Sequence, residues 1–222
     1  MKNLKSYYEK DADFRKNEKS HSDIHIRFKY FIWPMIRNLP KYYRILDAGT
    51  GSGYMVNEIR KRGFVTIGSD LSSKMIKIAK KDYGNYFVTD DIMKSRFKDN
   101  QFDVVIFSET LEHIPDLNRA MKELRRVASK YILITVPYKE KVVMEVCPHC
   151  LKKYHKSGHI HYFDNAKIDI IVRKHKLKIV KMKKLMHMPY VKLGYPLGRV
   201  ANKAIDILDL STGVVILFEV KK

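Results

Sequence analysis

Residues 45–53 read Ile-Leu-Asp-Ala-Gly-Thr-Gly-Ser-Gly, which is the end of an apolar run followed by a glycine-rich turn. Gly49, Gly51 and Gly53 allow the backbone to turn sharply and to approach a ligand closely. Asp47 lies just before them, and a carboxylate at that place suits a ligand that carries an amino group or a positive charge. The stretch therefore predicts a strand, a turn and a helix, with a ligand site at the turn.

Apolar runs and amphipathic segments alternate along the chain. The apolar runs, typical of strands buried on both faces, cover residues 43–46, 65–69, 86–89, 103–107, 131–136, 177–185 and 214–220. Segments with apolar residues at helical spacing cover residues 23–38, 55–61, 72–81, 117–128 and 164–175. This alternation predicts an α/β fold with a mostly parallel seven-stranded sheet and helices on both faces. Ligands of such sheets bind at the carboxyl ends of the strands, where the glycine turn lies.

Asp70 ends the second predicted strand, 17 residues after Gly53. A carboxylate at that place can accept hydrogen bonds from both hydroxyls of a ribose. A nicotinamide dinucleotide is the alternative ligand. Its binding fingerprint requires a glycine where this chain has Tyr54, and a dinucleotide has no use for a carboxylate at Asp47. A turn with a purely structural role is the third interpretation.

Four stretches resemble the successive motifs of class I S-adenosylmethionine-dependent methyltransferases. They are ILDAGTGSGY, IGSDLS with Asp70, the VTDD pair, and FDVVIFSETLEHIPDLNRAMKELRRVAS. The resemblance covers residues 43–137 and implies one Rossmann-like, doubly wound domain over residues 1–222. The resemblance favours a methyltransferase over a dinucleotide-binding enzyme, and over a turn with a purely structural role.

The resemblance also implies a role for each motif residue. The glycines pass under the methionine part of S-adenosylmethionine, and Asp47 supports the turn and the amino end. Asp70 holds the ribose hydroxyls, and Asp90, or else Asp91, accepts a hydrogen bond from the adenine amino group. The complete set of expected cofactor-binding residues is Asp47, Gly49, Gly51, Gly53, Asp70, Leu71, Asp90, Asp91 and Ser108.

The motifs argue against two methyltransferase subclasses. Amino-directed methylases of adenine, cytosine or glutamine resemble one another in an Asn/Asp-Pro-Pro-Tyr/Phe motif after the fourth strand, where residues 108–111 here read Ser-Glu-Thr-Leu. Cytosine C5 methylation needs a nucleophilic thiol after a proline, whereas Cys147 here precedes Pro148. The remaining acceptors are an oxygen, a carbon or another nitrogen on a small molecule, lipid or glycan intermediate.

Glu109, Glu112 and His113 resemble the Glu-x-x-Glu-His of ubiquinone-biosynthesis O-methyltransferases, with which a divalent metal has been associated. Carboxylates and one imidazole would hold Mg²⁺ near a substrate oxygen. The candidate catalytic groups are His113, as a general base, Glu109 and Tyr138. A helix that begins at the pocket rim, with acidic groups near its positive end, explains the same residues. We favour that structural interpretation, because the string recurs across methyltransferases with different substrates.

Both cysteines and four of the nine histidines lie within residues 147–161. Two thiols so close together suit a shared metal better than a disulfide. Cys147, Cys150, His155 and His159 make a plausible tetrahedral zinc set. The string resembles an insert of a subset of class I methyltransferases, which implies a closed, structural zinc site. A loop with incidental histidines and free thiols is the alternative.

Two segments of the domain lie outside the methyltransferase motifs. Residues 1–40 are expected to form a helical lid, and Tyr7, Tyr8 and Arg27 are candidates to close over the pocket. Residues 139–163 are the expected zinc-binding insert, which lies on the cofactor face because it follows the fifth strand.

The net charge of +20 is concentrated in residues 151–203, which contain 14 Lys or Arg and 2 Asp. Such a field attracts a polyanion such as RNA, or an acidic membrane surface. A lysine-rich surface explains it as well, and we place this slightly ahead because aromatic residues are not interleaved with the cations. An RNA or protein methyltransferase that docks through this region is the second functional hypothesis. A catalytically silent, zinc-stabilised binding module is the third.

The chain carries no stretch of about 20 apolar residues, the length of a membrane-spanning helix. Its first residues also lack the apolar core of a secretory signal. We therefore expect a cytoplasmic protein, and the sequence leaves its oligomeric state open.

Overall fold

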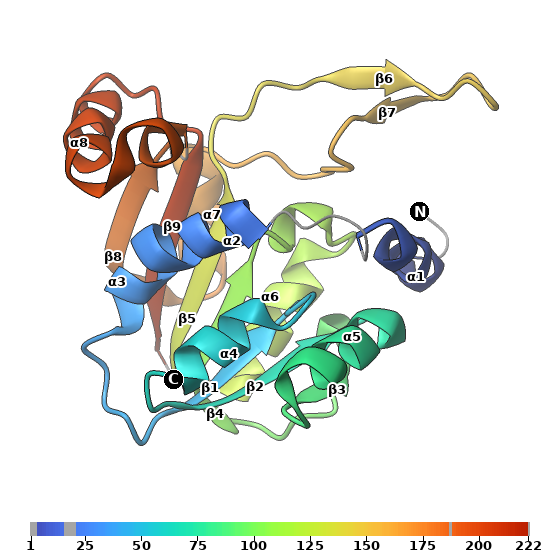
Figure 1. Ribbon diagram of the computed structural model, residues 1–222, viewed down its shortest axis with the longest axis vertical. Helices are drawn as coiled ribbons and strands as arrows, with labels where there is room; N and C mark the ends of the chain where they lie inside the picture. Colours follow the sequence, from blue (N-terminus) through green and yellow to red (C-terminus); the bar gives the residue numbers. More distant parts are fainter. Residues whose placement is uncertain (1–3, 16–20, 187, 222) are drawn as a thin grey trace.

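A seven-stranded sheet forms the centre of the computed structural model, which describes residues 4–15, 21–186 and 188–221 (Figure 1). Its strands are β1 (Arg44–Ala48), β2 (Val65–Asp70), β3 (Phe87–Thr89), β4 (Phe102–Ser108), β5 (Ala128–Pro137), β8 (Leu177–Leu185) and β9 (Gly213–Val220). Each lies within a few residues of a predicted strand, because a buried strand shows as an unbroken apolar run.

The strand order is β3-β2-β1-β4-β5-β9-β8. Strands β1 to β5 pair in parallel, and β9 runs antiparallel to both β5 and β8. The predicted mostly parallel sheet of seven strands is therefore confirmed. The carboxyl ends of β1, β2, β3 and β4 lie at one edge of the sheet, which is where the predicted ligand residues gather.

Helices cover both faces of the sheet, as predicted. They are α1 (Leu4–Arg15), α2 (His21–Arg27), η1 (Phe28–Ile32), α3 (Trp33–Ile36), α4 (Tyr54–Arg60), α5 (Ser73–Tyr83), η2 (Ile92–Lys94), η3 (Leu111–His113), α6 (Leu117–Val127), α7 (Asn165–Lys174) and α8 (Met188–Ile207). None of the helices in the described ranges is long and apolar enough to cross a membrane.

Strand β4 shows how the two layers are packed. Val105 and Phe107 belong to the core beneath α6 and α7, whereas Val104 and Ile106 belong to the core beneath η1, α3 and α4. Alternate side chains of a strand point to opposite faces, so one apolar run serves both layers. All four side chains are fully buried.

Residues 139–163 form an arm that projects from the domain (Figure 1). Within it β6 (Met144–Val146) and β7 (Lys153–His155) pair antiparallel, with Val146 opposite Lys153 and Met144 opposite His155. The sequence did not predict these strands, because both faces of the hairpin are largely exposed and the alternation of a half-buried strand is missing.

Candidate cofactor and acceptor site

The glycine turn after β1 is held by Asp70, the last residue of the neighbouring strand β2. The backbone N–H of Gly51 donates to Asp70 Oδ2 at 2.9 Å, and that of Ser72 donates to Oδ1 at 2.9 Å. Each carboxylate oxygen has a second lone pair for a further donor such as a ribose hydroxyl. The geometry is consistent with the role predicted for Asp70.

The glycines of the turn serve different purposes. Gly51 has a φ of +55°, and a Cβ there would meet only Met75 Cε at 3.8 Å, so this position faces open space next to the ligand cavity. Gly53 has a φ of +83°, and a Cβ there would lie 2.6 Å from Phe87 Cζ and 2.8 Å from Ala79 Cβ. Gly53 therefore allows close packing of the turn against β3 and α5, and it does not line the cavity.

Asp47 lies beneath the turn and is 1% exposed. Its Oδ2 accepts a hydrogen bond from Thr50 Oγ1 at 2.8 Å, while its Oδ1 is buried without a partner among the described residues. Burial raises the pKa of Asp47 to about 7; the bond from Thr50 opposes this shift and the charge of Asp70 adds to it. Asp47 does not line the ligand cavity, so in this structure it supports the glycine turn through Thr50.

A cavity opens between the glycine turn, the ends of β2, β3 and β4, and helix α1. Its lining combines polar groups with an apolar wall that suits an adenine ring. The residues that line it are Tyr8, Asp11, Gly49, Gly51, Ser69, Asp70, Leu71, Ser72, Met75, Asp90, Asp91, Ile92, Phe107, Glu109, Thr110, His113 and Ile114.

Asp90 and Asp91 both reach this cofactor cavity. Asp90 accepts from Ser95 Oγ at 2.7 Å and from the backbone N–H of Arg96 at 3.1 Å, so both of its oxygens are engaged. Asp91 Oδ1 accepts from the backbone N–H of Met93 at 2.9 Å, which caps η2. The geometry does not favour Asp90 over Asp91 as the partner of an adenine amino group.

Helix α1 is fixed against the first turn of α5. Glu9 accepts from the backbone N–H of Ser73 at 2.7 Å and from that of Lys74 at 3.2 Å, and Lys74 Nζ contacts Asp13 at 2.7 Å. A carboxylate at a helix N-terminus satisfies N–H groups that lack a partner within the helix. This contact brings Tyr8 into the cavity wall, as the lid prediction requires.

Glu109 lies where the cofactor cavity meets a second cavity, and it lines both. Its φ is +46°, a conformation that costs a non-glycine residue about 1–3 kcal/mol and that clusters at functional sites. Thr135 Oγ1 donates to Glu109 Oε1 at 2.9 Å, and Arg27 Nη2 lies 3.7 Å from Oε2. Arg27 was a candidate lid residue in the sequence. Thr135 was not predicted as a site residue. It is the one polar residue in the apolar run 131–136, and that position could have indicated a functional role.

The second cavity has a volume of about 410 Å³. Its wall combines two cations, two carboxylates and an imidazole with apolar side chains, so it suits a polar small molecule. The residues that line it are Arg27, Phe31, Glu109, Thr135, Pro137, Glu140, Lys141, His159, Leu185, Thr212, Gly213 and Val214. We call it the acceptor cavity.

Tyr138 and Ser108, like Asp47 and Gly53, lie outside both cavities. Tyr138 is fully buried, and its hydroxyl donates to Asn165 Oδ1 at 3.0 Å, so it packs α7 against the sheet. Ser108 Oγ is 2.8 Å from Thr135 Oγ1. Because Thr135 donates to Glu109, Ser108 supports Glu109 through that hydroxyl.

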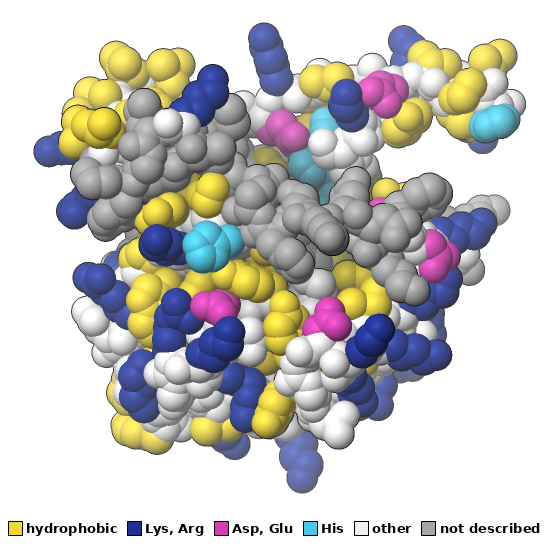
Figure 2. Space-filling model, viewed as in Figure 1, with side chains coloured by type: hydrophobic (Ala, Val, Ile, Leu, Met, Phe, Trp, Pro, Cys, Tyr) yellow, Lys and Arg dark blue, Asp and Glu magenta, His cyan; other side chains and the backbone are white. Residues whose placement is uncertain are grey.

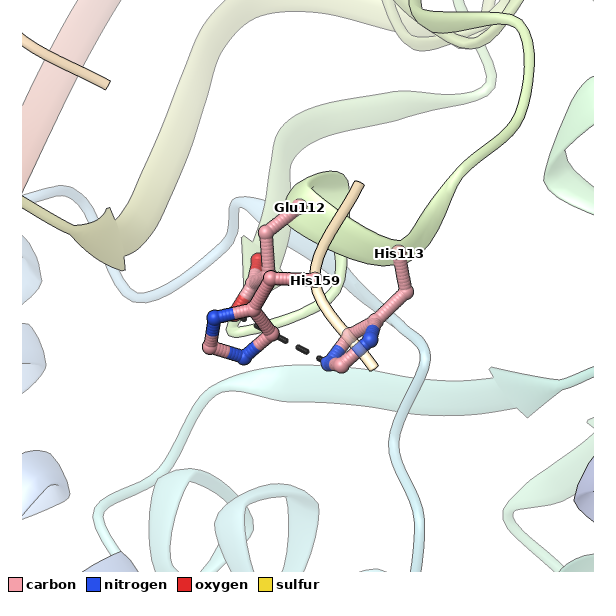
Figure 3. A group of neighbouring side chains, drawn as sticks. All are labelled: Glu112, His113 and His159. Atoms are coloured by element: carbon pink, nitrogen blue, oxygen red, sulfur yellow. Dashed lines mark ion pairs between the residues drawn. The ribbon is translucent and has the colours of Figure 1, made fainter. Parts of the chain in front are cut away.

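The structure divides the predicted Glu-x-x-Glu-His set. Glu112 and His113 belong to one group with His159 of the insert (Figure 3). Glu109 instead contacts Arg27 and Thr135. Glu112 is 1% exposed, and burial, together with the charge of Glu109, raises its pKa well above the ordinary range. The three residues proposed for Mg²⁺ therefore do not converge on one point.

The predicted zinc set is also divided. Cys147 and Cys150 lie together at the tip of the β6–β7 hairpin, where Cys147 N donates to the Lys152 carbonyl. His155 and His159 lie at its base and are grouped with Glu140. Among the described residues neither cysteine belongs to a group of metal-ligating side chains. The four predicted ligands do not fit one zinc ion in this structure.

Residues 46–131 match the family model described as a methyltransferase domain. Over this segment the chain is similar to a methyltransferase domain. The match spans the glycine turn, Asp70, the two aspartates after β3 and the Glu109 segment, and it supports the prediction of an S-adenosylmethionine-dependent methyltransferase.

Solved structures have the same fold as this chain. An S-adenosylmethionine-dependent methyltransferase of Methanosarcina mazei superposes with a TM-score of 0.63 at 18% identity, covering 84% of this chain and 97% of that one. A protein of Pyrococcus horikoshii superposes with a TM-score of 0.65 at 17% identity, covering 89% and 91%. At this level of sequence identity the similarity shows the fold and does not indicate the substrate.

Curated relatives match over shorter stretches. The ubiquinone biosynthesis O-methyltransferase of Pasteurella multocida is 30% identical over 88 residues, which are 33% of this chain and 36% of that protein. An uncharacterized protein of Methanocaldococcus jannaschii is 30% identical over 126 residues, 56% of this chain and 54% of its own length. A sterol 4-C-methyltransferase of Caenorhabditis elegans is 30% identical over 89 residues, 37% and 27%. The match thus spans 36%, 54% and 27% of the length of these three relatives, and the two whose names give a reaction differ in acceptor atom.

Proposed function

We propose that the protein transfers a methyl group from S-adenosylmethionine to an oxygen or nitrogen of a polar small molecule held in the acceptor cavity. The observation that carries this proposal is the position of Glu109, which lines both the cofactor cavity and the acceptor cavity. Among the acceptor atoms left open by the sequence, oxygen and nitrogen are favoured because a carboxylate at the junction can take up their proton.

The residues around the cofactor cavity would divide the binding of S-adenosylmethionine among them. Asp70 would take the ribose hydroxyls, and Gly51 would let the backbone approach the ligand. Bound in this way, S-adenosylmethionine supplies a methyl group on a positively charged sulfur, and a neutral thioether is left after transfer. The apolar wall and helix α1 would shield the reacting groups from water, which would strengthen electrostatic contacts there.

Glu109 would accept the proton of the acceptor hydroxyl or amino group as that atom bonds to the methyl carbon. Thr135 and Arg27 hold the two oxygens of this carboxylate, so it is oriented before the acceptor binds. Such positioning contributes much of the rate in methyl transfer, because the reaction needs an in-line approach. His113, which also lines the cofactor cavity, is the second candidate base.

The proposal is tested with S-adenosylmethionine labelled in its methyl group and a cell extract separated into small-molecule, lipid, RNA and protein fractions. We expect label in the small-molecule fraction. Glu109→Gln should lower the rate by about 10²–10⁴-fold, the usual contribution of a positioned base, and change affinity for S-adenosylmethionine only a few-fold. Glu219→Gln is the matched control, since Glu219 forms an exposed ion pair with Lys178 on the edge strand. Label confined to the RNA, lipid or protein fraction would refute the proposed acceptor class.

Docking of RNA or protein through the basic carboxyl-terminal region remains the alternative. On the face seen in Figure 2, Lys and Arg side chains are spread over the domain, and hydrophobic ones gather on α8 and on the β6–β7 hairpin. Leu197, Val200 and Ile207 of α8 are exposed by 63%, 70% and 75%. RNA docking would show binding that weakens steeply with added salt, as release of counterions requires.

A further inference from the structure

The base of the insert is folded back onto residues 112–114, in the segment that follows β4. The backbone N–H groups of Ile160 and His161 donate to the Glu112 carbonyl at 2.9 and 3.2 Å, and His161 Nε2 lies 2.8 Å from the Ile114 carbonyl. His113 Nδ1 lies 3.3 Å from the Gly158 carbonyl. These contacts bring two histidines of the insert beside the acceptor cavity, far from the cysteines at the hairpin tip.

Glu140, His155 and His159 form a compact group at this place. One ligand atom of each lies within 4.8 Å of the others. His159 Nδ1 is 2.5 Å from Glu140 Oε2, and the rings of His155 and His159 stack with centroids 5.0 Å apart. This spacing is close to that of three ligands around one ion. Small rotations of the side chains would bring the ligand atoms to metal–ligand distances of about 2.0–2.2 Å.

One of these groups is buried without a partner. His155 is 7% exposed; its Nδ1 accepts from the backbone N–H of His159 at 3.2 Å, and its Nε2 has no hydrogen-bond partner in the described part of the chain. A buried ring nitrogen without a hydrogen-bond partner is unfavourable, so the position favours a bound group that satisfies the ring. A neutral imidazole has only one lone pair, so the 3.2 Å bond from the His159 N–H to Nδ1 has to open when the ring binds an ion.

We propose that Glu140, His155 and His159 bind one divalent transition-metal ion, with zinc as the best match. Two imidazoles and one carboxylate favour zinc or a similar ion over Mg²⁺. Three protein ligands leave one position of a tetrahedral site open. Glu140 and His159 line the acceptor cavity, so the open position lies at its wall. A water or, if the proposed function holds, an acceptor oxygen would complete the site.

The cysteines do not share this ion. Cys147 pairs with Lys152 at the tip, whereas His155 lies opposite Met144 at the base. Three residues along a strand separate these levels by about 10 Å, which is far beyond the span of one coordination sphere. The ion therefore fastens the base of the insert to the loop after β5, and it leaves the hairpin tip free of metal.

The experiment uses the full-length protein, stripped with a chelator and titrated with Zn²⁺ by calorimetry, and with Co²⁺ by absorption spectroscopy. The variants are Glu140→Gln, His159→Gln and the double variant Cys147→Ser with Cys150→Ser. His149→Gln is the matched control, since His149 is an exposed histidine at the hairpin tip. Circular dichroism confirms that each variant is folded, and neither measurement depends on methyl transfer or on S-adenosylmethionine.

We expect one ion per chain, a loss of affinity of about 100-fold or more in Glu140→Gln and His159→Gln, and unchanged binding in the double cysteine variant and in His149→Gln. The Co²⁺ spectrum should lack a sulfur-to-cobalt charge-transfer band. A sulfur band that disappears in the double cysteine variant would overturn the proposal in favour of the Cys₂His₂ set. Failure of the folded wild-type protein to bind Zn²⁺ would also overturn it, and would leave the proposed methyl transfer untouched.

Discussion

Replacement of Gly53 by alanine tests whether this glycine is required for packing. The new Cβ would lie 2.6 Å from Phe87 Cζ and 2.8 Å from Ala79 Cβ, distances that force these neighbours to move. Such overpacking costs about 1–3 kcal/mol. The φ of +83° adds about 1–2 kcal/mol, because alanine rarely adopts it. We expect the free energy of unfolding to fall by about 2–5 kcal/mol.

Gly63→Ala separates the two contributions. Gly63 has a similar φ of +86°, but a Cβ there would meet nothing within 4 Å, so only the backbone cost remains. Urea denaturation should show a loss of about 1–2 kcal/mol for Gly63→Ala, and therefore a difference of about 1–3 kcal/mol between the two variants. Equal destabilisation of both would refute the packing role of Gly53.

Three further predictions concern the turn, the lid and the cavity. The raised pKa of Asp47 means that the folded state holds its proton to about pH 7 while the unfolded state releases it near pH 4, so stability declines as pH rises between these values. Asp47→Asn should remove about 4 kcal/mol of that decline in the free energy of unfolding. Urea titrations at pH 4 and pH 8 measure it. An equal decline in the variant would contradict the argument that burial raises the pKa of Asp47. Glu9→Ala should destabilise the protein by about 1 kcal/mol through loss of the cap on α5, and it should weaken S-adenosylmethionine binding because Tyr8 of the same helix lines the cavity; calorimetry that shows unchanged affinity would refute the lid. Gly51→Ala should weaken that binding without the packing loss of Gly53→Ala, because its Cβ would enter the space beside the cavity; a stability loss as large as that of Gly53→Ala would contradict this.

The sheet was predictable because its strands are buried on both faces. Strand β4 is an unbroken apolar run after Asp103, and β8 has the predicted bounds Leu177–Leu185. Helix α5 was placed by the spacing of its apolar residues, and Ser72 caps it, because its side chain accepts from the backbone N–H of Met75 at 3.3 Å. Local capping and periodicity decide these elements, so one sequence suffices.

Helix α8 was missed because its sequence contains helix breakers. Pro189, Gly194, Pro196 and Gly198 lie within Met188–Ile207, and propensity argues against a helix there. Packing beside β8 decides its structure, as Asn202 shows: it is 3% exposed, and its side chain accepts from the backbone N–H of Met186 at 2.7 Å.

The candidate site was predicted where it depends on motifs and missed where it depends on distant contacts. Asp70 and Glu109 follow from their places after strands. Glu9 reaches Ser73 across 64 residues, and no pattern in the sequence indicates that pairing. Glu140 was missed for the same reason, and the histidines of the insert were assigned to the cysteines beside them in sequence, although the hairpin holds them apart.

The central claim is that the glycine turn and Asp70 bind S-adenosylmethionine. It is tested most directly by calorimetric titration of the purified protein with S-adenosylmethionine and S-adenosylhomocysteine, beside Asp70→Ala and the exposed control Asp82→Ala. We predict micromolar binding by the wild-type protein and by Asp82→Ala, and its loss in a folded Asp70→Ala variant. Absence of binding by the folded wild-type protein, or binding that survives in Asp70→Ala, would contradict the account.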